Sequence, residues 1–279
     1  MKKITRRSFL AAAGLTAAAL ALTACGGSSS STASSTASSA AASSEAASSS
    51  AAAELTTVEA GKLTMATNAA FPPYEMTTDT GAFEGIDVDT AQAIAENLGL
   101  ELQIDDMDFD AALLSVQQGK ADIVMAGVTV TDERKAVMDF SDSYATGIQS
   151  IIVPEGSDIA TPDDLAGKKI GTQRGTTGYI YCSDDFGDEN VVAYDDGLTA
   201  VQALNNGQVD AVVIDNAPAK EFVAANPGLV ILDTSYAEED YAIGMAKGSA
   251  LEDAINATLE ELKADGTLQS IVDKYITAE

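Results

Sequence analysis

Arg134 is placed to hold an anion at the end of a buried strand. Residues 123–125 form a short apolar run, which predicts a strand buried on both faces, as in a parallel sheet. Thr131 can cap the helix that follows, and Arg134 lies about one turn into that helix. Ligands bind outside the carboxyl ends of strands in open α/β sheets, where a guanidinium can hold a carboxylate. The alternative is that Arg134 is a solvated residue paired with Asp132 or Glu133.

An internal repeat indicates two lobes of similar construction. Residues 112–125 read ALLSVQQGKADIVM and residues 200–213 read AVQALNNGQVDAVV. Each copy predicts a helix, a glycine stop, an aspartate and an apolar strand, with Gly119 and Gly207 lying 88 positions apart. Polar residues follow both predicted strands: Gly127, Thr129 and Arg134 in the first copy, and Asp215 and Asn216 in the second. Two α/β lobes whose rims face one another would form a cleft.

The segment 68–74, NAAFPPY, follows a predicted strand at 62–67 and cannot be helical, because it contains two adjacent prolines. Phe71 and Tyr74 would therefore project from a rigid loop at the end of that strand, where they could contact a ligand. The alternative is that both rings plug the edge of the domain.

The acidic run 105–110 suggests a calcium loop but lacks the required pattern. Ala111 and Gln117 stand where such a loop needs glycine and glutamate. We therefore expect Asp108 to cap a helix over the following residues, and Phe109 to lie in the core or in a cleft.

The remaining patterns alternate between strands and helices. A helix through 88–98 is expected to stop at Gly99. The loop 173–178 leads into a further helix, whose N-terminus would favour binding of an anion. It is not a P-loop, because the Lys-Ser/Thr pair is missing. The other predicted strands are 100–104, 148–153, 229–232 and 241–246, and the other predicted helices are 110–118, 216–225, 249–264 and 266–275.

Bulk composition excludes several classes of function. The formal net charge is −28, which argues against nucleic-acid binding, because that needs a basic surface. Histidine is absent, so the commonest general base and metal ligand is missing, and we predict no catalytic residue, metal or cofactor. Cys25 and Cys182 lie in such different settings that we expect no disulfide between them. Cys182 has no basic neighbour and is expected to be an inert structural thiol.

Residues 1–24 have the features of an export signal, because four basic residues precede an apolar run at 9–22. The pair Arg6-Arg7 resembles a twin-arginine signal, but Sec signals also carry such pairs, so both export routes stay open. The sequence LTAC, which ends at Cys25, resembles the lipobox of bacterial lipoproteins. That resemblance implies cleavage before Cys25 and a lipid on its sulfur. The alternative is an ordinary signal peptide that contains a cysteine.

Residues 25–58 would form a lipidated, Ser- and Ala-rich tether. This segment has too little bulky apolar surface to offset the entropy of ordering, so we expect a flexible link between the membrane and the folded part.

Several motifs in the folded part carry a family resemblance. They are ATNAAFPPYE, GIDVDTAQAIAENLG, MDFDAALLSVQQGKADIVMAGVTVTDER, DFSDSY, IGTQRGTTG and ADGTLQSIVDKY. The region 62–276 resembles the extracellular solute-binding proteins, family 3, of polar amino-acid ABC transporters. The resemblance implies a type II periplasmic-binding-protein fold of class α/β, in which two lobes, each a mostly parallel sheet flanked by helices, meet at a two-strand hinge. Lobe 1 would comprise 59–146 and 240–279, and lobe 2 would comprise 147–239.

The resemblance also implies roles for the groups that hold the ligand's main chain. Arg134 would bind the ligand carboxylate, helped by Thr129 and by N–H groups near Thr129 and Thr176. Asp215 would pair with the ligand ammonium, assisted by the carbonyl of Gly127. An amino-acid zwitterion needs such a cation and an opposed carboxylate.

A second group of residues is expected around the ligand's side chain. Phe71 and Phe109 would sandwich it, and Thr177 belongs to the same predicted set. Relatives often have an acidic residue at the position of Asn68, so a cationic ligand would gain less here. Gln173 points to hydrogen bonding with a polar, uncharged side chain.

The function implied by the resemblance is that of a receptor for a free L-amino acid. It would deliver that amino acid to ABC transporter permease subunits, act as a monomer and be lipid-anchored outside the cell membrane. One alternative is a periplasmic enzyme resembling cyclohexadienyl dehydratases, although no activated nucleophile for hydrolysis is evident. The few residues after Tyr275 leave no room for a sensor kinase domain. Another alternative is a structural surface protein that binds no ligand.

Overall fold

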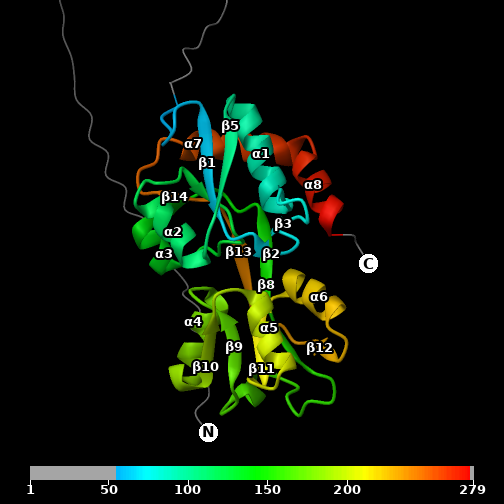
Figure 1. Cartoon of the computed structure of the whole chain (residues 1–279). Coiled ribbons are helices and arrows are strands. Elements are labelled where there is room, and N and C mark those ends of the chain that lie inside the picture. Colours follow the sequence, from blue (N-terminus) through cyan, green and yellow to red (C-terminus); the bar gives the residue numbers. More distant parts are fainter. Residues whose placement is uncertain (1–54, 277–279) are drawn as a thin grey trace, which may run out of the picture. The chain divides into compact units, whose positions relative to one another are not determined.

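The computed structural model describes residues 55–276 and shows two groups of elements, each built around its own sheet (Figure 1). The predicted signal peptide (1–24), Cys25 and most of the predicted tether (25–58) lie outside the described residues. Within residues 55–276, no helix is both long enough and apolar enough to cross a membrane.

Lobe 1 is built on a five-stranded sheet. In spatial order its strands are β5 (Glu101–Asp106), β1 (Lys62–Thr67), β6 (Ile123–Val124), β14 (Gly244–Ala246) and β7 (Met138–Phe140). The strands β5, β1 and β6 are parallel, whereas β14 is antiparallel to both of its neighbours. A small antiparallel sheet belongs to the same lobe and consists of β2 (Ala70–Phe71), β3 (Glu75–Thr77) and β4 (Phe83–Glu84).

Lobe 2 repeats the arrangement with a six-stranded sheet. Its strands are β10 (Val191–Tyr194), β9 (Ile170–Gln173), β11 (Ala211–Asp215), β8 (Ala145–Pro154), β12 (Leu229–Ile231) and β13 (Ala237–Tyr241). Here β10, β9 and β11 are parallel, while β8 is antiparallel to β11, β12 and β13.

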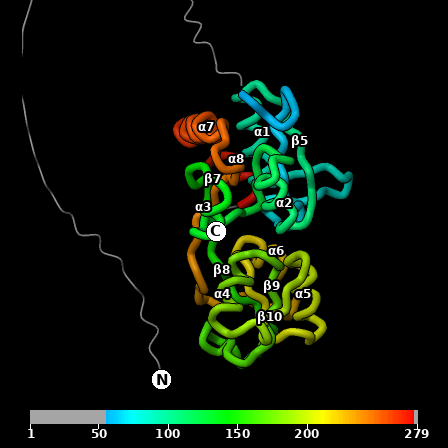
Figure 2. Tube along the Cα trace, turned by 90° about the vertical axis from the view of Figure 1, so that its left-hand side faces the viewer, coloured from blue at the N-terminus to red at the C-terminus, as the bar shows by residue number. Residues whose placement is uncertain are grey.

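Helices cover both faces of each sheet, as the continuously buried central strands β1, β6 and β11 require. In lobe 1, Met65 and Ile123 pack under α1, α7 and α8, whereas Ala66 and Val124 face α2. Figure 2 shows α7 and α2 on opposite sides of lobe 1. The helices are α1 (Ile86–Leu98), α2 (Phe109–Gln117), α3 (Asp132–Val137), α4 (Thr177–Phe186), α5 (Gly197–Asn205), α6 (Asn216–Ala225), α7 (Glu252–Ala264) and α8 (Thr267–Tyr275), with short 3₁₀ turns η1 (Pro162–Leu165) and η2 (Asp188–Asn190).

The strands β8 and β13 connect the lobes side by side (Figures 1 and 2). They pair antiparallel from Gln149 opposite Ala237 to Ala145 opposite Tyr241. The predicted two-strand hinge is therefore confirmed. The prediction of one return strand at 241–246 is wrong, because the chain leaves the hinge strand β13 at Tyr241 and enters the lobe 1 sheet only at β14. The strand β13 has the acidic sequence AEEDY and so gives no apolar signal, and only its last residue, Tyr241, belongs to the apolar run 241–246.

The predicted repeat corresponds to α2–β6 in lobe 1 and α5–β11 in lobe 2. Both glycines adopt left-handed backbones, with φ of 66° at Gly119 and 67° at Gly207, and both end their helices by the same pattern of backbone hydrogen bonds. The aspartate before each strand also makes the same kind of hydrogen bond, to a backbone N–H group. Asp122 accepts a hydrogen bond from the N–H of Thr64, and Asp210 accepts one from Lys169, in each case at the neighbouring parallel strand.

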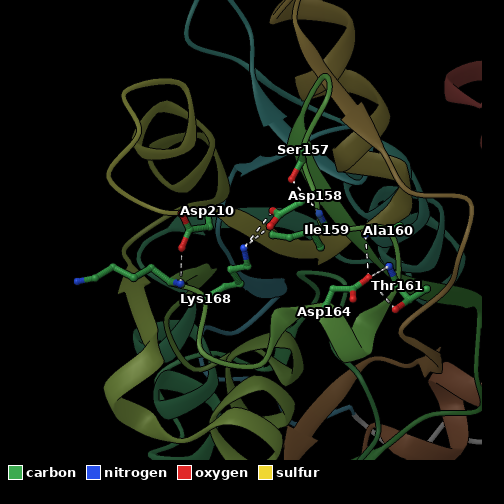
Figure 3. Close-up of polar contacts among 9 residues, drawn as sticks. Ser157, Asp158, Ile159, Ala160, Thr161, Asp164, Lys168 and Asp210 are labelled. Atoms are coloured by element: carbon green, nitrogen blue, oxygen red, sulfur yellow. Dashed lines mark hydrogen bonds and ion pairs between the residues drawn. The ribbon is translucent and has the colours of Figure 1, made fainter.

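Polar contacts beside η1 fix the entry into β9 (Figure 3). The Asp164 carboxylate accepts hydrogen bonds from the N–H groups of Ala160 and Thr161, at 3.1 and 2.9 Å. Lys168 forms an ion pair with Asp158 at 2.9 Å. These contacts hold the edge of lobe 2 and contribute nothing to the cavity described below.

Two sequence predictions in lobe 1 need correction. Asp108 does precede α2, but its side chain forms no capping hydrogen bond. Tyr74 lies in the core with 4% of its surface exposed, where it stacks on Phe71 and packs edge-on against Tyr241. The loop that was expected to present both rings turns inward at Tyr74, because the small sheet closes back on it.

Candidate ligand-binding site

A small cavity lies between the two lobes at the hinge. All ten predicted ligand-binding residues line it: Asn68, Phe71, Phe109, Gly127, Thr129, Arg134, Gln173, Thr176, Thr177 and Asp215. Sequence reasoning missed five further lining residues: Glu75, Ala126, Gln149, Ile214 and Tyr241. The carboxyl ends of strands from both sheets therefore meet at one place, as the repeat predicts.

Arg134 enters the cavity from α3 and is only 8% exposed. Thr131 caps this helix through the Arg134 N–H at 3.2 Å, as predicted. The guanidinium donates to the carbonyl of Thr129 at 2.8 Å and to that of Gly175, in the other lobe, at 3.1 Å, and lies 5.4 Å from the Phe109 ring centre. Burial lowers the pKa of Arg134. The alternative of a solvated side chain is wrong, since Arg134 forms no ion pair within residues 55–276.

Asp215 faces the cavity from the end of β11 and is 2% exposed. Its carboxylate caps α6 by accepting from the N–H of Ala217 at 3.2 Å, and it also accepts from the Tyr241 hydroxyl. Burial raises the pKa of Asp215 to about 6, although these hydrogen bonds oppose the shift. Within the described residues no cation pairs with this carboxylate, so a cationic group of a ligand would relieve its desolvation.

Three contacts cross from lobe to lobe without involving the hinge strands and show that the cleft is closed. The Gln173 amide donates to Asn68 Oδ1 at 2.8 Å, and the hydroxyls of Thr129 and Thr177 lie 3.4 Å apart. The third is the hydrogen bond from Arg134 to Gly175 in lobe 2. Asn68 and Gln173, both expected to meet the ligand, therefore bind each other in this state.

The start of α4 forms the lobe 2 wall. Thr176 is its N-cap, with Oγ1 accepting from the N–H of Tyr179 at 3.4 Å and donating to the Gln173 carbonyl at 2.8 Å. Thr177 begins the helix and is buried. The free N–H groups of this first turn point a positive dipole end toward the cavity.

Glu239, in the hinge strand β13, lies just behind the cavity and was not anticipated. Its Oε2 accepts hydrogen bonds from the Thr129 hydroxyl at 3.1 Å and from the Gln149 amide at 3.0 Å. No local pattern marks Glu239 for this role, because it stands in an acidic run of a highly acidic chain. Only the pairing of β13 with β8 turns it inward.

Glu75 was also missed, although it closes the motif AFPPYE. The pairing of Phe71 with Glu75 in the small sheet directs this carboxyl inward, and its exposure is 0%. It lies beside Asp87, which accepts a hydrogen bond from the N–H of Gly127 at 3.0 Å. Burial, and next the charge of Asp87, hold the pKa of Glu75 well above its usual value. Burial likewise raises the pKa of Asp87 to about 6.

Comparison with known proteins decides the family. The model of the bacterial extracellular solute-binding proteins, family 3, matches residues 63–278. The chain belongs to this family. This solute-binding protein is 33% identical to the L-cystine-binding protein TcyJ of Escherichia coli, over 79% of this chain and 85% of TcyJ.

Solved structures agree with the fold of this solute-binding protein. It is similar to the arginine-, lysine-, histidine-binding protein ArtJ from the thermophilic bacterium Geobacillus stearothermophilus, with a TM-score of 0.75, 34% identity and coverage of 78% of this chain and 96% of that one. It is also similar to an ancestral arginine-binding protein bound to glutamine, with a TM-score of 0.75, 41% identity and coverage of 78% and 99%. The predicted type II periplasmic-binding-protein fold is confirmed. The family consists of receptors, and the dehydratase alternative finds no support.

Proposed function

We propose that this protein binds one free polar L-amino acid between its lobes and delivers it to the permease of an ABC importer. The observation that carries the proposal is the pair formed by Arg134 and Asp215, a buried cation and a buried carboxylate that line one cavity from opposite lobes. The ligand carboxylate would meet Arg134, and the ammonium would meet Asp215 and the Gly127 carbonyl. Relatives named for cystine, arginine, histidine and glutamine support an amino acid as the ligand.

A thermal-shift screen of the twenty amino acids and cystine, followed by calorimetry of those that stabilise the protein, tests this function. A ligand at about 100 times its dissociation constant stabilises the folded state by about 2.7 kcal/mol. A chain that responds to none of these compounds would contradict the proposal and favour a structural surface protein. Incubation with prephenate or arogenate tests for catalysis, and we expect both compounds to be recovered unchanged.

Closure would follow from a hinge motion of β8 and β13, because only the shut state lets both lobes contact one ligand. We place lobe 1 at 59–146 and 240–279, and lobe 2 at 147–239. Pairing of β8 with β13 across both boundaries supports this division. Expression of 147–239 alone, followed by circular dichroism, tests whether this segment folds by itself.

We further propose that Cys25 carries a lipid that anchors a monomeric receptor to the outer face of the cell membrane, after removal of the signal peptide 1–24. The lipobox-like sequence LTAC and the extracellular character of the family support this placement. Acyl chains contribute about 0.8 kcal/mol for each buried methylene. Cys25→Ser should therefore abolish labelling by radioactive palmitate and release the protein from the membrane fraction. Labelling that persists in this variant would exclude Cys25 as the modified residue.

A further inference from the structure

Two carboxyl groups lie together in the interior of lobe 1, beside Gly127. Glu75 comes from β3 and Asp87 from the first turn of α1, and both side chains are 0% exposed. Each carboxyl lies within hydrogen-bonding reach of the other. Because ionised carboxylates only accept hydrogen bonds, a bond between these two groups requires a proton on one of them.

The donors around the pair are too few to satisfy it without such a proton. Gly127 donates its N–H to Oδ2 of Asp87 at 3.0 Å. Neither oxygen of Glu75, nor Oδ1 of Asp87, accepts a hydrogen bond from any donor of the described residues. Leaving buried oxygens unpaired is costly. One proton held between Glu75 and Asp87 gives an oxygen of each carboxyl a partner.

No cation of the described residues neutralises the pair. The other groups that face it are the carboxyl of Asp106, from the end of β5, and the phenols of Tyr74 and Tyr144. The nearby cations are engaged elsewhere: Arg134 with the carbonyls of Thr129 and Gly175, Lys263 of α7 with the Ser143 carbonyl, and Lys274 of α8 with Asp89. Burial and mutual repulsion therefore favour a pair that keeps one proton.

The expected titration of the pair follows from this setting. Burial raises the pKa of Asp87 to about 6 and holds the pKa of Glu75 well above its usual value. Two carboxyls this close titrate as a unit, in two steps. Between the two steps the pair carries one proton and one negative charge.

The pair holds a backbone group of the ligand cavity. Gly127 lines the cavity with φ of 55°, and a Cβ at this position would meet the Phe71 ring at 2.9 Å. Glycine is the residue with the greatest backbone freedom, so its peptide groups need a partner to fix their direction. The bond from the Gly127 N–H to Asp87 supplies one, and a bond to a charged acceptor is stronger than a neutral one.

We propose that Glu75 and Asp87 share one proton at neutral pH, and that Asp87 is a positioning residue that holds Gly127 in the orientation required by the ligand ammonium. Asp87 acts through Gly127, and Glu75 keeps Asp87 in place by donating the shared proton. The effect on the ligand rests on the proposed function, whereas the shared proton does not. At sufficiently alkaline pH this proton passes to water, the two carboxylates repel each other, and Gly127 loses its support.

Infrared spectroscopy at pH 7 tests the shared proton. The wild type should show the C=O stretching band of a protonated carboxyl group. Glu75→Gln should lack this band, because the new amide can donate to Asp87 without a titratable proton. Glu84→Gln, in the neighbouring strand β4, is the matched control and should keep the band. Identical spectra of the wild type and Glu75→Gln would overturn the proposal.

Urea denaturation as a function of pH gives a second readout. The raised pKa of Glu75 means that its contribution to stability is complete below pH 4.5 and is lost as the pH rises through the folded-state pKa. Between pH 5.5 and 7, the unfolding equilibrium constant of the wild type should therefore rise about tenfold per pH unit more than that of Glu75→Gln. Equal slopes for the two proteins would exclude a shared proton.

Two substitutions of Asp87 test its effect on binding, by calorimetry at pH 7 with L-glutamine and L-arginine. Asp87→Asn keeps an oxygen for the Gly127 N–H and should bind within about threefold of the wild type, whereas Asp87→Ala should bind at least about tenfold more weakly. Unchanged affinity in Asp87→Ala would refute the positioning role. If the wild type binds no amino acid, the proposed function fails, while the infrared spectra still decide the shared proton.

Hydrogen exchange of the wild type decides the positioning role if Asp87→Ala does not fold. The Gly127 amide should exchange at least about 100-fold more slowly than that of the exposed Gly156, because its bond to a buried carboxylate must open first. Equal exchange rates at the two glycines would show that Asp87 does not hold Gly127.

Discussion

Replacing Asp215 by asparagine should weaken ligand binding and stabilise the unliganded protein at the same time. Asparagine has nearly the same shape and is a good N-cap. Its Oδ1 can keep the hydrogen bond from the Ala217 N–H, and its Nδ2 can donate to the Tyr241 hydroxyl, which then accepts instead of donating. What the substitution removes is the negative charge. Truncating one partner of a buried charge pair costs about 2–5 kcal/mol, so the dissociation constant should rise by about 30-fold or more.

The stability change follows from the pKa of Asp215, which burial raises from 3.8 to about 6. Because the folded-state pKa is raised, the contribution of the protonated group is present below pH 4 and is lost as the pH rises through 6. Each pKa unit corresponds to about 1.4 kcal/mol, so the ionised carboxylate costs the unliganded protein about 3 kcal/mol at pH 8. Asp215→Asn lacks this cost and should be more stable than the wild type at pH 8, with a much smaller difference at pH 4.

Urea denaturation at both pH values and calorimetry with arginine or glutamine measure the two effects. Asp196→Asn is the matched control, because Asp196 caps α5 in the same lobe, accepts from the Thr199 N–H at 2.7 Å and does not line the cavity. A dissociation constant of Asp215→Asn within about threefold of the wild type, less than 1 kcal/mol, would refute the assignment of Asp215 to the ammonium. A variant less stable than the wild type at pH 8 would refute the desolvation argument.

Three further changes test the site and the core. Arg134→Lys keeps the charge but loses the planar fork, so calorimetry should show about a 100-fold weaker affinity for any amino acid that binds; unchanged affinity would exclude a bidentate contact. Gln173→Ala removes the hydrogen bond to Asn68 across the cleft and should weaken affinity about fivefold, the worth of one neutral hydrogen bond of about 1 kcal/mol. In a Cys25→Ser background, Cys182 should not react with Ellman's reagent at pH 8 until the protein is denatured, because it is fully buried and burial raises its pKa to about 12. Rapid labelling of the native protein would contradict that.

The sequence by itself determined much of the local structure and the places of two charged residues that line the cavity. The repeat with Gly119 and Gly207 predicts both helix–strand units, since a glycine stop and an apolar run are local signals. The same local logic placed Arg134 and Asp215 at the ends of strands, where the cavity lies. Burial of every residue of β11 likewise follows from its continuous apolar run, which is typical of a strand covered on both faces.

Only the tertiary structure decided which acidic residues face inward. Glu75 and Glu239 read like any other member of the 43 acidic residues, and no local pattern separates a buried carboxyl from a solvated one. Their burial depends on the pairing of β2 with β3 and of β13 with β8, which are contacts that the order of residues does not display. The same long-range packing closed Tyr74 into the core and joined Asn68 to Gln173 across 105 positions. Such pairings set the charges around the cavity, because electrostatics depends on distance in space, not on separation along the chain.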